Sequence, residues 1–287
     1  MTVLEIIQRS TEFLARKGIE APRLQAELLL AHVLKLPRMR LYLSFERVLA
    51  EAEVAAMRES VVRRGAREPL QHIVGSTSFC GYEIAVNCSV LVPRPETELL
   101  AELGWNFLKE KAAETGGEVL VLDFGTGSGC LAIALAHNCP AARIDALELR
   151  PESLALARQN VAAHSLTGRV LCFEGKSLEA LPAGRRYHLV ISNPPYIPSG
   201  EIAGLEPEVR DYEPRDALDG GPDGLDFYRY LAVAAAVRLL PGGRLMVEFG
   251  DGQADAVTQL LKEQNWIVEA PMADYTGRLR LLAARLP

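Results

Sequence analysis

The sequence predicts an α/β protein, in which a small N-terminal helical bundle and a β-hairpin precede a doubly wound, mainly parallel sheet. From Val119 onward, apolar strand patterns alternate with helical patterns, which is typical of a parallel sheet covered by helices. Before about residue 64 only the helical period occurs, whereas strand-type residues surround Gly81. These observations divide the chain into a bundle at 1–70, a hairpin linker at 71–92 and a sheet domain at 93–287.

The composition indicates a globular, mildly acidic protein. Of 287 residues, 49% are hydrophobic and 24% charged, with a formal net charge of −6 and a pI near 5.5. Such a chain can bury one large or two modest cores. The acidic balance argues against binding of long nucleic acid, which needs dense Lys and Arg. The five cysteines form no C-x-x-C pair and have no metal-ligand spacing, which predicts a protein without a metal. The chain has no apolar run of membrane length and no signal-peptide core, so we expect a cytoplasmic protein without a membrane partner.

Residues 1–64 are expected to form three helices. Their apolar stripes are Val3, Ile6, Ile7 and Leu14 in the first, Leu24, Leu28, Ala31 and Leu34 in the second, and Val54, Met57 and Val61 in the third. Because each stripe is too small to be stable alone, the helices should pack as a bundle. The cluster of Arg63, Arg64 and Arg67 is interpreted as a solvated helix end rather than as a contact with an acidic partner.

The sheet domain begins with Val92-Pro93-Arg94-Pro95-Glu96-Thr97-Glu98, where two prolines fix an extended entry to a helix. Spacing alone assigns no role to its charged residues. The predicted strands lie at 119–124, 143–149, 187–192, 244–249 and 278–286, and the predicted helices at 96–103, 130–137 and 225–240. A long loop rich in Pro and Gly follows the strand at 187–192, and its length is typical of a substrate-binding segment.

A glycine-rich turn, Gly125-Thr126-Gly127-Ser128-Gly129, follows the strand at 119–124. Glycines at such a turn let a ligand approach the backbone and the N-terminus of the next helix. A dinucleotide fingerprint needs a glycine where this chain has Cys130, which disfavours a pyrophosphate. Glu148 ends the next strand, where a carboxylate can accept hydrogen bonds from both hydroxyls of a ribose. The pattern therefore indicates a nucleoside ligand without a pyrophosphate.

The strand at 187–192 runs into Asn193-Pro194-Pro195-Tyr196. Proline has no N–H, so the turn presents carbonyl acceptors without competing donors, and Asn193 adds a side-chain carbonyl. A group with two N–H bonds, such as a carboxamide or an exocyclic amine, can donate one to Asn193 Oδ1 and the other to the Pro194 carbonyl. Alone, the motif is also consistent with a proline-stiffened loop.

Together these stretches resemble a class I S-adenosylmethionine-dependent methyltransferase, and specifically the peptide chain release factor glutamine methyltransferase family. The resemblance covers essentially the whole chain, and its most specific motifs are Val92-Pro93-Arg94-Pro95-Glu96-Thr97-Glu98 and Tyr212-Glu213-Pro214-Arg215-Asp216-Ala217-Leu218-Asp219-Gly220-Gly221. It implies a seven-stranded Rossmann-like sheet with an antiparallel last strand, and a bundle that serves substrate recognition. It also implies methylation of the glutamine in the Gly-Gly-Gln motif of class 1 release factors.

The resemblance assigns roles to individual residues. It implies catalytic roles for Asn193, Pro194 and Tyr196, and substrate binding by Asn193, Pro194, Pro195 and Tyr196. It implies that S-adenosylmethionine is bound by Gly125, Thr126, Gly127, Ser128, Gly129, Glu148, Ser177 and Asn193. This chain departs from the family in having Glu148 where Asp is usual, and Lys176 where an acidic residue is usual near the adenine. Lysine cannot accept a hydrogen bond from the adenine amino group, so backbone at 176–177 or water has to replace that contact.

Two other readings stay open at this stage. Asn-Pro-Pro-Tyr also occurs in enzymes that methylate exocyclic amines of RNA or DNA bases, although the acidic balance and the absence of a basic recognition domain argue against this. A non-catalytic binding module leaves the intact Asn-Pro-Pro-Tyr unexplained. We expect a monomer with a release factor as its protein substrate and no stable nucleic-acid partner.

Overall fold

The computed structural model describes residues 1–287 and divides them into two compact units. The helical unit comprises Met1–Ser76 and Glu206–Tyr212, and the sheet unit comprises Thr77–Leu205 and Glu213–Pro287. The division falls inside the expected linker at 71–92, within the first strand of its hairpin. That hairpin is formed by β1 (Ser76–Phe79) and β2 (Tyr82–Ala85), as predicted.

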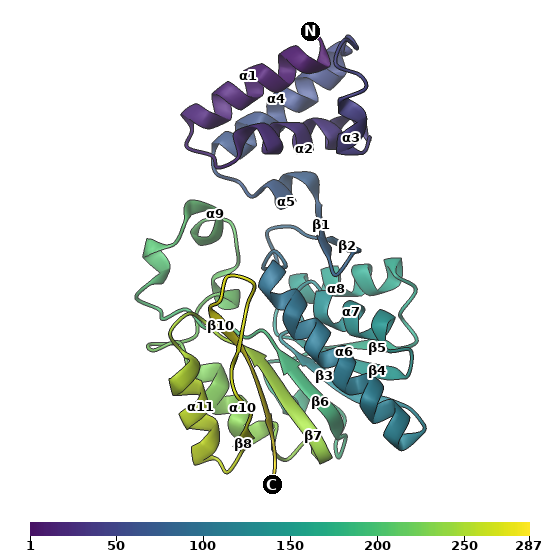
Figure 1. Ribbon diagram of the computed structural model, residues 1–287, viewed down its shortest axis with the longest axis vertical. Coiled ribbons are helices and arrows are strands. Elements are labelled where there is room, and N and C mark those ends of the chain that lie inside the picture. The colour runs from purple at the N-terminus through teal and green to yellow at the C-terminus, as the bar shows by residue number, and fades with distance from the viewer. The chain divides into compact units, whose positions relative to one another are not determined.

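The helical unit contains the three predicted helices, α1 (Val3–Arg16), α2 (Pro22–Leu34) and α4 (Glu51–Gly65), drawn in purple to blue in Figure 1. The short helices α3 (Arg38–Leu41) and α5 (Leu70–Val74) were not predicted. The stripes of α1 and α4 point into the core as expected, but the stripe chosen for α2 was wrong at Leu24, which is exposed. Three consecutive leucines, 28–30, allow two apolar faces, and the structure buries the one with Ala26, Leu29 and Leu30.

The arginine cluster at the end of α4 was misinterpreted as a solvated helix end. Arg64 is buried, and its guanidinium donates to Glu208 at 2.7 Å, while Arg67 pairs with both Glu206 and Glu208. These acidic residues belong to the segment that contains α9 (Pro207–Arg210), far away in the sequence. The acidic partner of the cluster is therefore part of the same unit.

The sheet unit is built on a mainly parallel sheet in the order β5-β4-β3-β6-β7-β10-β8, with β9 paired to β10. The parallel strands are β3 (Val119–Phe124), β4 (Ala142–Glu148), β5 (Val170–Glu174), β6 (Tyr187–Ser192) and β7 (Leu239–Glu248). The remaining strands are β8 (Ile267–Val268), β9 (Met272–Ala273) and β10 (Leu279–Arg285). Strand β10 is antiparallel to β7, as expected. The expected count of seven strands was too low by one, because the two-residue β9 adds an eighth.

Helices cover both faces of this sheet (Figure 1). One core packs α6 (Pro95–Thr115), α7 (Cys130–Asn138) and α8 (Pro151–Ala163) against it, and a second core packs α10 (Asp226–Ala234) and α11 (Ala254–Glu263) against the other side. Gly104 lets α6 approach closely, since a Cβ there would lie 2.9 Å from Leu135 Cδ2. The predicted doubly wound α/β fold is confirmed.

The predicted helix at 225–240 was too long. Helix α10 ends at Ala234, and β7 already begins at Leu239, which pairs with Tyr187 of β6. The register shifts between Tyr187 and Leu189, and this irregularity accommodates Pro241-Gly242-Gly243 within the strand.

Candidate active site

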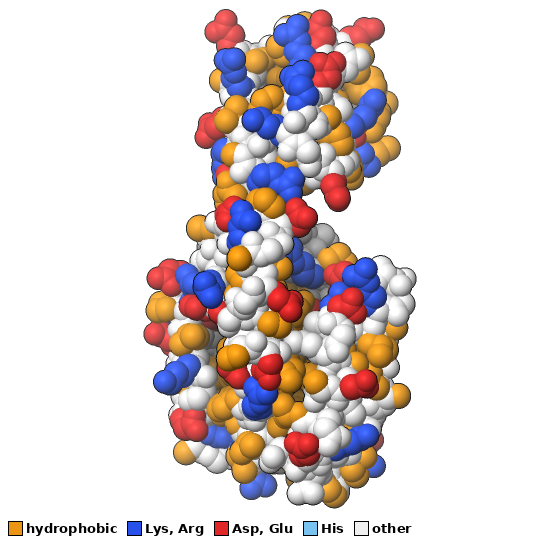
Figure 2. All heavy atoms as spheres, turned by 90° about the vertical axis from the view of Figure 1, so that its left-hand side faces the viewer, with side chains coloured by type: hydrophobic (Ala, Val, Ile, Leu, Met, Phe, Trp, Pro, Cys, Tyr) orange, Lys and Arg blue, Asp and Glu red, His pale blue; other side chains and the backbone are white.

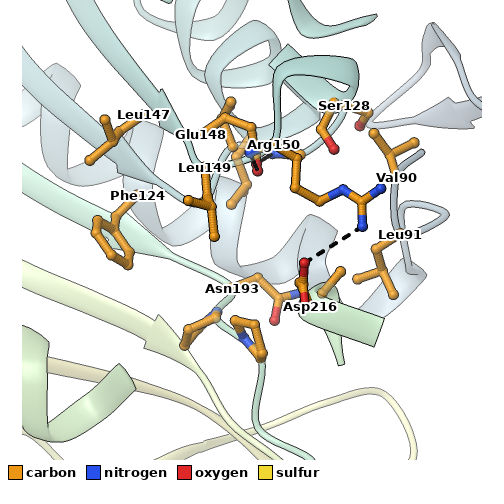
Figure 3. A pocket seen from close by; sticks show the side chains of 18 of the residues that line it. Val90, Leu91, Phe124, Ser128, Leu147, Glu148, Leu149, Arg150, Asn193 and Asp216 are labelled. Atoms are coloured by element: carbon orange, nitrogen blue, oxygen red, sulfur yellow. Dashed lines mark hydrogen bonds and ion pairs between the residues drawn. The ribbon is translucent and has the colours of Figure 1, made fainter. Parts of the chain in front are cut away.

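A cavity of about 240 Å³ opens at the carboxyl ends of β3, β4 and β6 (Figure 3). From β3 the chain continues to β4 and β5 on one side, and then crosses to β6 on the other side. Ligands of open α/β sheets bind at such a switch point. The cavity is lined by the glycine turn after β3, the end of β4 and the Asn-Pro-Pro turn after β6.

The glycine turn takes a backbone conformation that other residues rarely adopt. Gly125, Gly127 and Gly129 have φ values of +73°, +56° and +83°. A Cβ at Gly125 or Gly127 would meet nothing within 4 Å, so the backbone is open to a ligand there. A Cβ at Gly129 would lie in ordinary van der Waals contact with α8, 3.5 Å from Ala157 Cβ, so a side chain there would meet the helix.

Asp123 supports the turn from beneath. It is fully buried, and its Oδ2 accepts a hydrogen bond from Thr126 Oγ1 at 2.5 Å. Burial raises the pKa of Asp123 to about 7, although the Thr126 hydroxyl opposes the shift. Because the carboxyl group is held to the turn, it fixes the position of the backbone that faces the cavity.

Glu148 lies at the end of β4 with its carboxylate at the cavity (Figure 3). Its Oε2 accepts from the Gly127 N–H at 2.9 Å and its Oε1 from the Arg150 N–H at 3.0 Å. Each oxygen keeps a second lone pair, so the oriented carboxylate can accept two more hydrogen bonds. This suits a pair of neighbouring hydroxyl groups.

Asn193 lies on the other side of β3, directly after β6. Its Nδ2 donates to Thr97 Oγ1 at 3.0 Å, and the Thr97 hydroxyl donates to Glu248 Oε2 at 2.7 Å. Neither Asn193 Oδ1 nor the Pro194 carbonyl oxygen accepts a hydrogen bond from the protein. Two acceptors without a protein donor therefore belong to consecutive residues that line the cavity.

The remaining wall is partly apolar and partly charged. Phe124, Leu149 and Phe227 give it apolar surface suited to a flat ring, and Lys176 lies among the lining residues. Arg150 Nη1 faces Asp216 Oδ2 at 3.7 Å across the cavity in Figure 3. Asp216 belongs to η3 (Arg215–Ala217), in the long loop after β6.

Eight of the predicted site residues line this cavity: Gly125, Thr126, Gly127, Ser128, Glu148, Asn193, Pro194 and Pro195. Gly129, Ser177 and Tyr196 do not. Ser177 precedes η1 (Leu178–Ala180). Tyr196 packs beneath the turn against Gly250, where an added Cβ would lie 3.0 Å from Tyr196 Cδ2. Burial raises the pKa of Tyr196 to about 12.

Sequence reasoning missed the roles of Arg94, Thr97, Arg150 and Asp216, which also line the cavity. Arg94 Nη2 binds both carboxylate oxygens of Glu213, at 2.8 and 2.7 Å, and Glu213 is buried. The available signal was the pair of motifs at 92–98 and 212–221, which contain Arg94, Thr97 and Asp216; Arg150 lies in neither motif. The structure explains them as two segments joined by an ion pair beside the cavity.

Rossmann-like methyltransferases, among other α/β proteins, combine a mainly parallel sheet of this kind with a cavity at the switch point. A methyltransferase small domain model matches residues 102–203, and a PrmC N-terminal domain model matches residues 5–75. The catalytic domain of hMettl16, solved in complex with the MAT2A 3′UTR hairpin 6, has a TM-score of 0.56 and 16% identity, covering 80% of this chain and 84% of that one. That likeness concerns the fold alone.

Closer relatives define the family. A release factor glutamine methyltransferase of Geobacter sulfurreducens is 43% identical over 285 residues, covering 99% of this chain and 97% of that protein. Another from Chlorobaculum tepidum is 43% identical over 258 residues, covering 88% of this chain and 87% of that protein. The chain belongs to the release factor glutamine methyltransferase family, and the resemblance predicted from the motifs is confirmed.

Proposed function

We propose that this chain transfers a methyl group from S-adenosylmethionine to the side-chain amide nitrogen of the glutamine in the Gly-Gly-Gln motif of class 1 peptide chain release factors. The observation that carries the proposal is the pair of unpaired acceptors, Asn193 Oδ1 and the Pro194 carbonyl, beside the glycine turn. The names of the relatives support the choice of substrate. We infer further that the enzyme acts as a monomer in the cytoplasm, and that its helical unit recognises the release factor. No helix of the chain has the length and apolar character that crossing a membrane requires.

The residues around the cavity fit S-adenosylmethionine. The open backbone at Gly125 and Gly127 leaves room for its amino-acid end, and the spare lone pairs of Glu148 suit the two ribose hydroxyls. The apolar surface of Leu149 and Phe227 suits adenine. When bound, the cofactor supplies an electrophilic methyl group on a sulfonium.

The Asn-Pro-Pro turn supplies the positioning that the reaction needs. A carboxamide nitrogen is a poor nucleophile because its lone pair is delocalised into the carbonyl. If Asn193 Oδ1 and the Pro194 carbonyl each accept one N–H of the substrate amide, they hold that nitrogen in a fixed orientation and favour its lone pair leaving conjugation. This is catalysis by positioning and by preorganised dipoles. No general base is needed before transfer, because the nitrogen becomes acidic only as it is alkylated.

The charge distribution agrees with a protein substrate rather than with a long nucleic acid. The net charge is −6, and on the face of the sheet unit shown in Figure 2, Lys and Arg side chains alternate with Asp and Glu. A nucleic-acid enzyme would present a continuous basic surface.

Methyl-labelled S-adenosylmethionine separates the possible substrates. The enzyme is incubated in parallel with a class 1 release factor, total RNA and DNA, and we expect label on the release factor alone. A release factor whose target Gln is replaced by Glu should stay unlabelled, because a carboxylate offers no N–H to Asn193 and Pro194. Mass spectrometry locates the methyl group. Label on that Glu, or equal label on RNA, would contradict the amide assignment.

Glu148→Ala is expected to weaken binding of S-adenosylmethionine by about 1.5–3 kcal/mol, the range for hydrogen bonds to a charged group. The loss follows from removing the acceptor for the ribose hydroxyls, together with the anchor of the Gly127 N–H. Isothermal titration calorimetry measures it. Glu174→Ala is the matched control, since Glu174 is an exposed acidic residue that ends β5 outside the cavity. Equal affinity of both folded variants would place the ribose elsewhere.

A further inference from the structure

The amide of Asn193 is held from behind by two buried residues of distant elements. Thr97, in the first turn of α6, accepts from Asn193 Nδ2 at 3.0 Å and donates to Glu248 Oε2 at 2.7 Å. Thr97 is 3% exposed and Glu248, the last residue of β7, is 2% exposed, so water does not compete for these bonds. The three side chains form one relay that ends at the cavity.

The chemistry of the relay fixes its direction. A carboxylate can only accept, so the single hydroxyl proton of Thr97 is directed at Glu248. Thr97 then has only lone pairs to offer Asn193, and the amide must turn its Nδ2 toward Thr97. As a result Oδ1 faces the cavity. In the opposite orientation Nδ2 would face the substrate, where it would meet another N–H donor.

We propose that Thr97 and Glu248 are positioning residues, which hold the Asn193 amide with its oxygen toward the substrate nitrogen. Thr97 also lines the cavity, but in this role both residues act through the Asn193 amide. The orientation itself is a property of the free enzyme, and only its effect on methyl transfer rests on the proposed function.

The relay depends on the ionisation of Glu248. The charged and titratable groups that face this carboxyl are Glu96 and Arg94 at the start of α6, Arg280 of β10, Tyr196 after β6 and Tyr228 of α10. Burial raises the pKa of Glu248 to about 7, and the Thr97 hydroxyl and the two arginines oppose the shift. When protonated, Glu248 can donate to Thr97, which can then donate to Asn193 and release the amide orientation. The rate should therefore fall as the pH falls through about 7.

Three variants test the relay in the full-length enzyme at saturating S-adenosylmethionine and release factor. Thr97→Val keeps the shape but removes the hydroxyl, and should slow single-turnover methyl transfer about 10- to 100-fold, the scale of one unpaired buried polar group, without changing calorimetric affinity for S-adenosylmethionine. Thr97→Ser keeps the hydroxyl and should stay within about threefold of wild type. Glu248→Gln cannot ionise. The acid limb of the pH profile should therefore be absent from Glu248→Gln and from Thr97→Val.

A second readout needs no substrate. The side-chain amide signals of Asn193, identified in ¹⁵N spectra by their loss in Asn193→Ala, should titrate with a midpoint near pH 7 in wild type and stay constant in Thr97→Val. If these signals titrate as expected but no release factor is methylated, the relay is supported and the proposed substrate is refuted. The proposal is overturned if Thr97→Val reacts at the wild-type rate and its amide signals titrate unchanged. It is also overturned if the acid limb survives in both variants, since it then belongs to another group such as Asp123.

Discussion

Asn193→Ala is expected to slow methyl transfer by about 10²–10³-fold, as loss of one preorganised group of an oxyanion hole does. The substitution removes Oδ1 and leaves one N–H of the substrate amide unpaired in a dry site. The glycine turn after β3 remains in place, as does Glu148 at the end of β4 on the side of β3 away from β6, so the affinity for S-adenosylmethionine should change little. Single-turnover rates at saturation of both substrates measure the effect. A wild-type rate would reduce Asn193 to a turn residue and refute the mechanism.

The companion variant Asn193→Asp separates the acceptor from its orientation. Aspartate still offers an oxygen to the substrate, but its second oxygen replaces Nδ2 opposite Thr97 Oγ1, whose proton is already directed at Glu248. Two carboxylates then compete for one hydroxyl proton in a buried site. We expect Asn193→Asp to transfer methyl groups faster than Asn193→Ala but more slowly than wild type. The acid limb of its pH profile should shift to higher pH.

The site residues that could be predicted from the sequence are those whose chemical role follows from a short sequence motif. The glycines at 125–129 predict a backbone that is open to a ligand. The prolines after Asn193 predict carbonyl acceptors without neighbouring N–H donors. Glu148 was found because it ends the strand after that turn. In each case the residues that act together are near neighbours, or occupy equivalent ends of adjacent strands.

The partners behind the site were not predictable in this way. Thr97 is 96 residues from Asn193 and 151 residues from Glu248, and no periodicity links such positions. The same holds for Arg64 and Glu208, which are 144 residues apart. Local patterns show that a helix end is charged, but only the fold shows what the charge meets.

Gly224→Ala is expected to destabilise the sheet unit by about 2–5 kcal/mol and to damage the active site with it. Gly224 has a φ of +77°, which alone costs an alanine about 1–2 kcal/mol. A Cβ there would lie 2.3 Å from the Tyr196 carbonyl oxygen and 2.6 Å from Gln253 Nε2, and overpacking of this kind adds about 1–3 kcal/mol. The Tyr196 carbonyl is backbone and cannot move without displacing the Asn-Pro-Pro-Tyr turn, and Gln253 Nε2 can move only by giving up its 2.8 Å hydrogen bond to that carbonyl.

Gly252→Ala isolates the contribution of the contact. Gly252 has a φ of +78°, close to that of Gly224, but it is exposed and a Cβ there meets nothing within 4 Å. It should therefore cost only the backbone strain of about 1–2 kcal/mol and leave methyl transfer unchanged. Urea unfolding followed by tryptophan fluorescence compares the two variants, and both tryptophans, Trp105 and Trp266, report on the sheet unit. Equal free energies of unfolding for the two variants would show that the turn after Tyr196 yields to an added methyl group, and that its rigidity does not hold Asn193 in place.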